Sequence, residues 1–429
     1  MRLQGVVSLV VAGLAVPGLG RAAVLRVPED YPSVLAGVDA ASAGDSVLVG
    51  PGTWRDLAIR PVSVCGTLLN VESALFLKPG ITVIGVAGAV ATTLDSGASS
   101  GSYPSTVEHA LPGTSLARLV GLTITGKGDG VSVCGASPLE LVDCVVTRNG
   151  HQALGVRQAD ITLRGCTVSE NELGASSSHD GAVFGFDYSI TALGCTFDHN
   201  RGPGLVVQMS HGWGSGIAVT LQDCLFQDHV YRGVLLADVT YLDVQRCTFL
   251  RNSIAGGTNG NGGGLDVVRC VGHVSFCTFA FDSAGGGGGA EIGSNVRIER
   301  NTFYACYAGI IGGALTMHPD VGTTDNIFAY SAGRRGAVSG SVPNPASGCN
   351  LYWANAAGDY FDQWVAAPSD IHADPLFCDP VTLNFHVEAA SPAAPANSHG
   401  CGLIGAHDVN CGPVSVEPTS WGRLKGLFK

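Results

Sequence analysis

One pattern of apolar and polar positions returns eight times between residues 141 and 332. Each copy has a small residue at a registered position, an apolar residue two places later and, in most copies, a polar residue five places later. The registered positions are Cys144, Cys166, Cys195, Cys224, Cys247, Cys277, Asn301 and Asn326. Their spacing varies between 22 and 30 residues, which is typical of a solenoid whose coils carry loops of different length.

Alternation within the motif assigns side chains to faces. The apolar column two places after the registered position consists of Val146, Val168, Phe197, Phe226, Phe249, Phe279, Phe303 and Phe328. Residues two apart in a strand share a face, so both columns are predicted to point inward. The residue between them, such as Thr248, is often Thr and suits an outward strand position. The residue five places on, such as Asn200, is expected in a turn because Asn tolerates left-handed backbone.

Short strands with like side chains at like positions predict an all-β parallel β-helix. Coils that stack at about 4.8 Å bury one continuous core that no coil buries alone. A propeller blade needs about 40 residues, and the regular Leu and Asn frame of a leucine-rich repeat is missing. The cysteine column is interpreted as small buried thiols rather than as disulfides or metal ligands, so no metal site is predicted.

The segment VPEDYPSVLAGVDAASAGDSVLVGPGTW at 27–54 precedes the repeat. It predicts a strand and then a helix with Val34 and Val38 on one stripe, which would cap the open end of a β-helix. The segment resembles the start of many secreted right-handed parallel β-helix proteins of the pectate-lyase-like superfamily, and the openings of pectin methylesterases and nitrous-oxide accessory β-helix proteins. The resemblance implies a right-handed parallel β-helix, a single-stranded solenoid with a short N-terminal capping helix.

Four segments follow from these patterns. Residues 1–23 have the basic start, apolar run and small-residue cleavage site of a signal peptide, so the protein is expected to be secreted or at the cell surface. The β-helix with its N-terminal cap is assigned to 24–345, and a C-terminal capping region to 346–412. The remaining residues, 413–429, form a tail. The capping region carries Cys349, Cys378, Cys401 and Cys411, which predict a disulfide but leave three pairings open.

The tail, SVEPTSWGRLKGLFK at its end, resembles short Trp-Gly-containing C-terminal tails on exported proteins of some bacteria. Trp421, Leu424 and Phe428 could form the apolar side of a basic amphipathic helix. Two interpretations stay open. The tail engages a sorting or surface-attachment system, or it is disordered or loosely docked.

Composition narrows the range of partners. The formal net charge is −12 and the chain has four lysines, so a basic patch for nucleic acid is absent from the sequence. After the N-terminal run, no apolar segment is long enough to span a membrane. We therefore expect neither a nucleic-acid partner nor a membrane span.

One column gathers charged and titratable side chains, four places after the registered position. It reads Arg148, Glu170, His199, Asp228 and Arg251. Stacked coils would bring these side chains together, with Asp198 and Arg232 beside them. Glu170, His199 and Asp228 are the candidate catalytic residues for acid–base work on a uronic acid, and Arg148, Asp198, Arg232 and Arg251 are candidate substrate ligands. The alternative is a solvated face of alternating charge.

A long loop, QMSHGWGSG at 208–216, offers a second binding candidate. His211 and Trp213 are predicted to line a sugar groove, with Trp213 as a stacking platform. The alternative is an ordinary long turn rich in Gly and Ser.

Fold alone does not give function. Acids in the column before the registered position are scattered, which makes a poor Ca²⁺ site, and the catalytic motifs of polygalacturonases and pectin methylesterases are not matched. Three functions stay open: a non-catalytic extracellular or cell-surface protein that binds glycans, a polysaccharide lyase or epimerase acting on a uronic-acid polysaccharide, and a purely structural surface module. No cofactor is predicted, and Ca²⁺ enters only with the lyase alternative.

Overall fold

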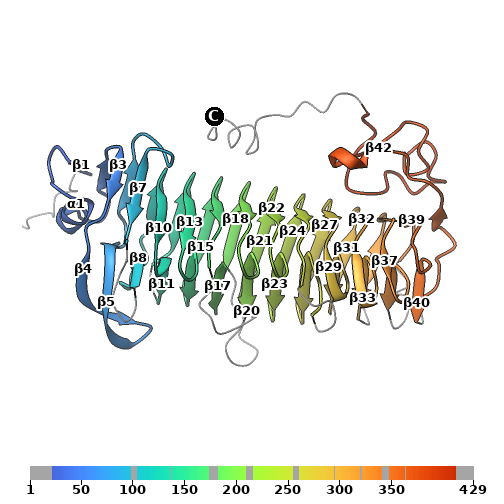
Figure 1. The fold of residues 1–429 in the computed structure, drawn as a ribbon, viewed down its shortest axis with the longest axis horizontal. Coiled ribbons are helices and arrows are strands. Elements are labelled where there is room, and N and C mark those ends of the chain that lie inside the picture. The colour runs from blue at the N-terminus through green and yellow to red at the C-terminus, as the bar shows by residue number, and fades with distance from the viewer. Residues whose placement is uncertain are drawn as a thin grey trace, which may run out of the picture.

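The computed structural model is an elongated parallel β-helix in which each coil gives one strand to each of three long sheets (Figure 1). The structure describes residues 22–97, 104–135, 137–172, 182–208, 216–254, 260–293, 295–318, 321–340, 347–362 and 364–411. The predicted signal peptide up to residue 21, the loop residues His211 and Trp213, and the tail lie outside the described residues.

Sheet A is parallel and has twelve strands in the described part of the chain. They are β1 (Val24–Val27), β2 (Ser46–Val49), β6 (Thr82–Gly85), β9 (Ala117–Val120), β12 (Leu139–Val142), β15 (Ile161–Arg164), β18 (Ile190–Leu193), β21 (Ala218–Gln222), β24 (Tyr241–Gln245), β27 (Gly272–Ser275), β31 (Val296–Glu299) and β35 (Gly322–Thr324).

Sheet B holds the strands of the repeated motif. They are β3 (Gly52–Trp54), β7 (Thr92–Asp95), β10 (Thr123–Gly126), β13 (Val145–Asn149), β16 (Thr167–Ser169), β19 (Thr196–Asp198), β22 (Leu225–Gln227), β25 (Thr248–Leu250), β28 (Thr278–Ala280), β32 (Thr302–Tyr304), β36 (Ile327–Ala329), β39 (Leu351–Trp353) and β41 (Ile371–His372). This sheet continues past residue 345, where the sequence placed the end of the β-helix.

Sheet C follows sheet B in each coil. Its strands are β4 (Ala58–Val64), β5 (Thr67–Phe76), β8 (Pro104–His109), β11 (Asp129–Cys134), β14 (Leu154–Arg157), β17 (Val183–Phe186), β20 (Leu205–Gln208), β23 (Val234–Ala237), β26 (Leu265–Val268), β30 (Ala290–Ile292), β34 (Leu315–Met317), β38 (Val338–Gly340) and β40 (Tyr360–Asp362). A short parallel sheet D, formed by β29 (Ser283–Gly286), β33 (Tyr307–Ile311) and β37 (Ala332–Gly333), lies in the turns between sheets B and C.

The N-terminal end is closed by helix α1 (Val34–Ala40). The Ser33 hydroxyl caps it by accepting a hydrogen bond from the Ala36 amide at 3.1 Å. Val34 and Val38 are buried against the first coils, so the predicted capping helix is confirmed. The antiparallel hairpin of β4 and β5 was not predicted. A disulfide joins Cys65, at its turn, to Cys134 at the end of β11.

Phenylalanine rings form a continuous stack inside the rod. Neighbouring rings from Phe197 to Phe328 lie 4.5–5.3 Å apart between centroids. Tyr352 extends the stack by one coil. All of these side chains are buried, and burying each ring contributes about 2–3 kcal/mol before any gain from stacking. The prediction that this column points inward is confirmed.

Eight cysteines of the described residues are free, and all eight are buried. They are Cys144, Cys166, Cys195, Cys224, Cys247, Cys270, Cys277 and Cys306. Their thiols donate to backbone carbonyls, as Cys166 Sγ does to the Leu141 oxygen at 3.3 Å. The interpretation of the registered cysteines as small core side chains is confirmed.

In the last coils the registered column changes from Cys to Asn. The Asn301 Nδ2 donates to Asn326 Oδ1 at 3.0 Å, and the Asn326 Nδ2 donates to Asn350 Oδ1 at 3.0 Å. Each acceptor also takes the backbone N–H of its neighbour. Asp370 ends this ladder by accepting from the Asn350 N–H at 2.9 Å.

The chain turns from sheet B to sheet C at the residue four places after the registered position, one place before the asparagine that was expected in the turn. The corner residues Arg148, Glu170, His199, Asp228 and Arg251 have φ between 50° and 56°. The prediction that the asparagines take the left-handed backbone was therefore wrong. Asn149, Asn171 and Asn200 are buried instead, because their amides bridge the coils at 2.9 Å. The charged neighbour takes the strained conformation and points outward.

Glycine runs close the same corner in later coils. A Cβ on Gly289 would lie 2.7 Å from the Phe303 ring and 2.8 Å from the Ala314 carbonyl. A Cβ on Gly264 would lie 2.9 Å from Phe249 Cβ. The chain therefore passes too close to the phenylalanine stack for any larger residue.

The C-terminal region folds back along the outward face of sheet B (Figure 1). It contains β42 (Phe377–Asp379), the 3₁₀-helix η1 (Pro380–Thr382) and β43 (Asn384–Val387). His407 Nε2 lies 2.7 Å from the Thr278 hydroxyl, and the Ala406 amide donates to the Thr302 hydroxyl at 3.0 Å. Thr278, Thr302 and Ile327 were predicted to be outward strand residues, yet they are buried because this region covers them.

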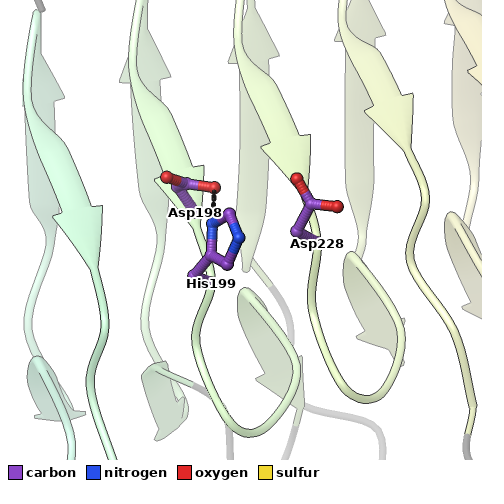
Figure 2. Close-up of side chains that lie close together, drawn as sticks. All are labelled: Asp198, His199 and Asp228. Atoms are coloured by element: carbon purple, nitrogen blue, oxygen red, sulfur yellow. Dashed lines mark hydrogen bonds and ion pairs between the residues drawn. The ribbon is translucent and has the colours of Figure 1, made fainter.

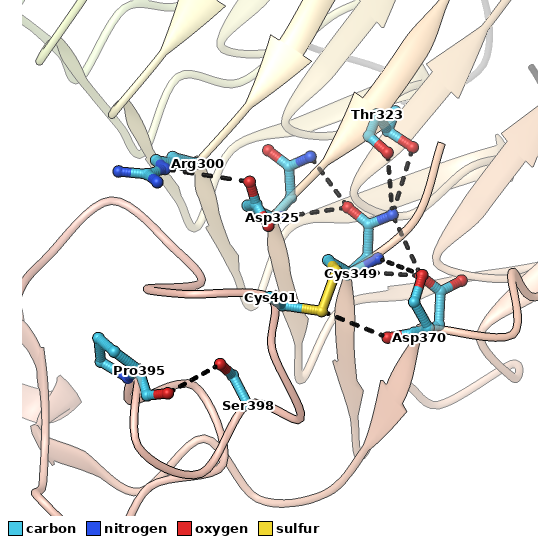
Figure 3. The surroundings of a disulfide bond; sticks show 11 residues. Arg300, Thr323, Asp325, Cys349, Asp370, Pro395, Ser398 and Cys401 are labelled. Carbon is cyan, nitrogen blue, oxygen red and sulfur yellow. Dashed lines mark hydrogen bonds and ion pairs between the residues drawn. A yellow bond between two sulfur atoms is a disulfide. The ribbon is translucent and has the colours of Figure 1, made fainter. Parts of the chain in front are cut away.

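Two disulfides hold the C-terminal region. Cys349 pairs with Cys401, which joins the region to a turn of the last coils (Figure 3). Cys378 pairs with Cys411. The predicted disulfide is thus confirmed, and the pairing that the sequence left open is resolved.

Candidate functional site

The charged column of the sequence occupies the corner after the sheet B strands. Arg148 Nε lies 2.6 Å from Glu170 Oε2, and both side chains are at least half exposed. Arg251 donates to both oxygens of Asp228 at 2.7 Å. Glu170 is therefore held by Arg148 and is not part of the set around His199.

Asp198, His199 and Asp228 do come together. His199 Nδ1 lies 2.5 Å from Asp198 Oδ1, and one ligand atom from each of the three residues lies within 4.8 Å of the others (Figure 2). The Gln227 amide also donates to Asp198 at 3.0 Å. His199 is 61% exposed, so this cluster lies on an open corner and not in a cleft. Its geometry suits a ligand or an ion more than buried acid–base chemistry.

Arg232 lies elsewhere. Its guanidinium contacts Asp266 Oδ2 at 2.5 Å on the outward face of sheet C, and both side chains are largely buried. The structure therefore separates Arg232 from His199 and joins it to a second group of titratable residues that the sequence did not single out.

This second group lies on an outward column of sheet C. In-register pairing aligns Asp266, Glu291, Thr316 and Ser339 on β26, β30, β34 and β38. All four are buried although they point away from the core. Glu291 Oε1 accepts a hydrogen bond from Asn261 Nδ2 at 2.9 Å and lies 3.3 Å from His318 Nε2.

Burial changes the protonation of both carboxyl groups. It raises the pKa of Asp266 to about 7, although the Arg232 charge acts in the opposite direction. It also raises the pKa of Glu291, against a lowering by the His318 contact. Desolvation disfavours a charged carboxylate, and here it outweighs the nearby cations. Part of the Asp266 carboxyl population is therefore protonated near neutral pH.

A pocket of about 270 Å³ opens beside Glu291. We call it the sheet C pocket. It is lined by Asn261, Gly286, Glu291, Ile310, Ile311, Thr316, Met317, His318, Ser339 and Gly340. Sheet D supplies one wall through Ile310 and Ile311, and the column of sheet C supplies its polar lining. Apolar walls with a few convergent polar groups are typical of small-ligand sites.

A signal for this site does exist in the sequence. Four strands of sheet C, β26, β30, β34 and β38, share a glycine, a small residue, an apolar residue and a polar residue, as in GGLD at 263–266 and GGAE at 288–291. The signal was missed because loops of variable length separate these strands from the registered positions. Only alignment on their own glycines brings Asp266 and Glu291 into one column.

Residues 111–272 match the family model described as right handed beta helix region. With the coil topology, this match defines a right-handed parallel β-helix protein, so the predicted fold is confirmed. No curated protein sequence matches the chain significantly. None of the helices in the described ranges has the length and apolar character needed to cross a bilayer.

Several solved structures are similar to the chain. Pectate lyase Pel9A has 11% identity and a TM-score of 0.45, over 92% of this chain and 98% of that chain. The A-module of mannuronan C-5 epimerase AlgE6 from Azotobacter vinelandii has 16% identity and a TM-score of 0.43, over 80% and 94%. Tailspike protein 3 of bacteriophage CBA120 has 12% identity and a TM-score of 0.40, over 75% and 55%. At these values the similarities concern the fold alone.

Proposed function

We propose that the protein is an exported β-helix protein that binds a glycan in the sheet C pocket. The observation that carries this proposal is the polar column of Glu291, Thr316 and Ser339 beside apolar Ile310 and Ile311. Sugars present hydroxyl groups and apolar ring faces, so they need this mixture of hydrogen-bonding and apolar contacts. Three disulfides support export, because such bonds persist in oxidising compartments.

Charge favours a neutral glycan over a polyuronate. Glu291 places a carboxyl group in the pocket, and Asp266 is its neighbour on the adjacent strand. The Arg232 guanidinium is already engaged by Asp266. The chain as a whole carries a formal charge of −12. A polymer of uronic acids would meet repulsion at this face, whereas neutral sugars would meet donors and acceptors.

Affinity electrophoresis against neutral and uronate polysaccharides tests the proposal. We expect retardation by a neutral glycan that is lost in Glu291→Gln and Asn261→Ala. Glu299→Gln is the matched control. It removes the same charge as Glu291→Gln, but Glu299 lies on sheet A, away from the pocket. Retardation that survives both pocket variants, or that occurs only with uronates, would overturn the proposal.

Cleavage of the bound glycan is a second candidate, favoured by the raised pKa of Asp266 and Glu291. A carboxyl group that stays protonated near neutral pH can serve as a general acid for glycosidic bond hydrolysis. Release of reducing ends from the retained glycan, absent in Asp266→Asn and Glu291→Gln, would support it. Binding without release would leave a binding protein.

A further inference from the structure

The cluster of Asp198, His199 and Asp228 lies outside the sheet C pocket and takes no part in the proposed glycan site. Asp198 ends β19, His199 is the corner residue after it, and Asp228 is the corner residue of the next coil (Figure 2). Backbone hydrogen bonds between coils fix these positions, since the His199 amide donates to the Gln227 carbonyl at 3.2 Å and the Asp228 amide to the Leu250 carbonyl at 3.0 Å.

The spacing of the three side chains fits one small cation. Their ligand atoms lie within 4.8 Å of one another. Two ligands of a tetrahedral zinc ion lie about 3.4 Å apart, because zinc bonds to His nitrogen and carboxylate oxygen are about 2.0–2.2 Å long. Rotation of the exposed His199 side chain, with smaller shifts of the partly buried Asp198 and Asp228, would bring the ligand atoms to this separation. In the described parts of the chain, this is the one group of three such residues with this proximity.

Gln227 gives an independent indication of a ligand. Its side chain is on β22 beside the cluster, 4% exposed, and its amide nitrogen donates to Asp198 Oδ1. The amide oxygen of Gln227 is buried and has no hydrogen-bond partner in the structure as described. An unpaired buried oxygen costs about 1–3 kcal/mol. Half a turn of the amide would break the hydrogen bond from the Gln227 nitrogen and bring the oxygen to face Asp198 instead. A cation bound between the two oxygens would then replace that hydrogen bond.

We propose that Asp198, His199 and Asp228 bind one divalent transition-metal cation of the zinc type, with the Gln227 amide oxygen as a further ligand. The imidazole favours zinc over Ca²⁺ or Mg²⁺, which prefer all-oxygen ligand sets. The Arg251 guanidinium competes with the cation for Asp228. It holds both oxygens of Asp228, and its positive charge opposes a cation at the same carboxylate.

Equilibrium dialysis of the full chain against Zn²⁺ alone tests this site. We expect one bound zinc, with affinity reduced at least about a hundredfold in His199→Asn and Asp198→Asn. Position 199 has a positive φ, and Asn tolerates this left-handed backbone. We therefore expect His199→Asn to preserve the fold. Arg251→Met should leave the affinity equal or tighter, because it frees Asp228. Cobalt substitution should give a visible absorption band that His199→Asn removes.

His372→Ala is the matched control. His372 also lies beside a carboxylate, with Nδ1 3.0 Å from Asp359 Oδ2, but it is not in a group of three. Its loss should leave zinc binding unchanged. Zinc affinity that stays unchanged in both His199→Asn and Asp198→Asn would overturn the proposal. So would equal competition by Ca²⁺, or weaker binding in Arg251→Met.

Discussion

The side-chain amide of Asn301 donates to the side-chain oxygen of Asn326 at 3.0 Å, and the same oxygen accepts the Asn301 backbone N–H at 2.9 Å. One amide group thus satisfies a buried backbone donor and a buried side chain of the preceding coil. A thiol has no oxygen to offer in this position, so the change from Cys to Asn replaces an apolar column by a chain of directed hydrogen bonds.

Asn326→Ala should lower the free energy of unfolding by about 3 kcal/mol, because the Asn301 backbone and side-chain donors would both be left buried without a partner. Chemical denaturation monitored by circular dichroism measures the change. Asn70→Ala is the control, since Asn70 is exposed on β5, and it should change stability by less than about 0.5 kcal/mol. Equal effects of the two variants would refute the ladder as a source of stability.

Phe249→Ala should destabilise the protein by about 3–5 kcal/mol, because it opens a cavity in the middle of the ring stack. Phe249 is fully buried between Phe226 and Phe279. Phe281→Ala removes the same side chain at a position that is 41% exposed, and it should cost much less. Thermal unfolding of both variants, side by side, measures the difference. A comparable loss in both would contradict a core role for the stack.

Glu108→Gln should stabilise the protein at high pH. Burial raises the pKa of Glu108 to about 7, and repulsion from Asp129 adds to the rise. The folded protein therefore holds a proton that the unfolded chain has lost, so stability falls as pH rises from about 4.5 to 7. Above that range the cost reaches about 3 kcal/mol.

Urea unfolding at pH 4, 5.5 and 8 checks this dependence on pH. In Glu108→Gln the fall between pH 4.5 and 7 should be smaller, and the gain over the unmodified chain should be largest at pH 8. Glu388→Gln changes the same charge at an exposed position and should keep the original slope. An unchanged slope in Glu108→Gln would show that Glu108 titrates as in an unfolded chain.

Replacing Cys349 and Cys401 by Ser should release the C-terminal region from sheet B. The disulfide spans 52 residues, and loss of such a cross-link costs about 4 kcal/mol on chain-entropy arguments. Hydrogen exchange of peptides that contain Thr302 and Ile327 should become faster, because the covering residues then open more often. Replacing Cys65 and Cys134 also removes a disulfide but should leave exchange at these peptides unchanged. Slow exchange in both double variants would contradict the covering role.

The sequence predicted the repeat, the stacked Phe column and the buried thiols because these features depend only on neighbours in one motif. A side chain such as Phe249 meets its counterpart in the next coil at the same register, so like positions must stack. The burial of Thr278 and Ile327 could not be predicted, because it depends on residues such as His407 that lie far along the chain.

The candidate sites were predicted only in part. Asp198, His199 and Asp228 come from adjacent coils of the regular motif, and their proximity follows from the repeat. The corner residues nevertheless carry the left-handed backbone that Asn was expected to take, since the buried amides are used between coils. Glu291 and His318 were missed because glycine-rich loops of unequal length separate sheet C from the motif.

The change from Cys277 to Asn301 divides the β-helix into two parts, which differ in how the registered side chains of neighbouring coils interact. From Cys144 to Cys277 the registered column makes no side-chain amide bridges, so one coil there can be exchanged for another without breaking a ladder at that position. From Asn301 onward the registered side chain of each coil hydrogen-bonds to that of the next coil, and the series ends at Asp370. A coil inserted after Asn301 must therefore carry an Asn at its registered position, or the hydrogen-bonded ladder that ends at Asp370 is interrupted.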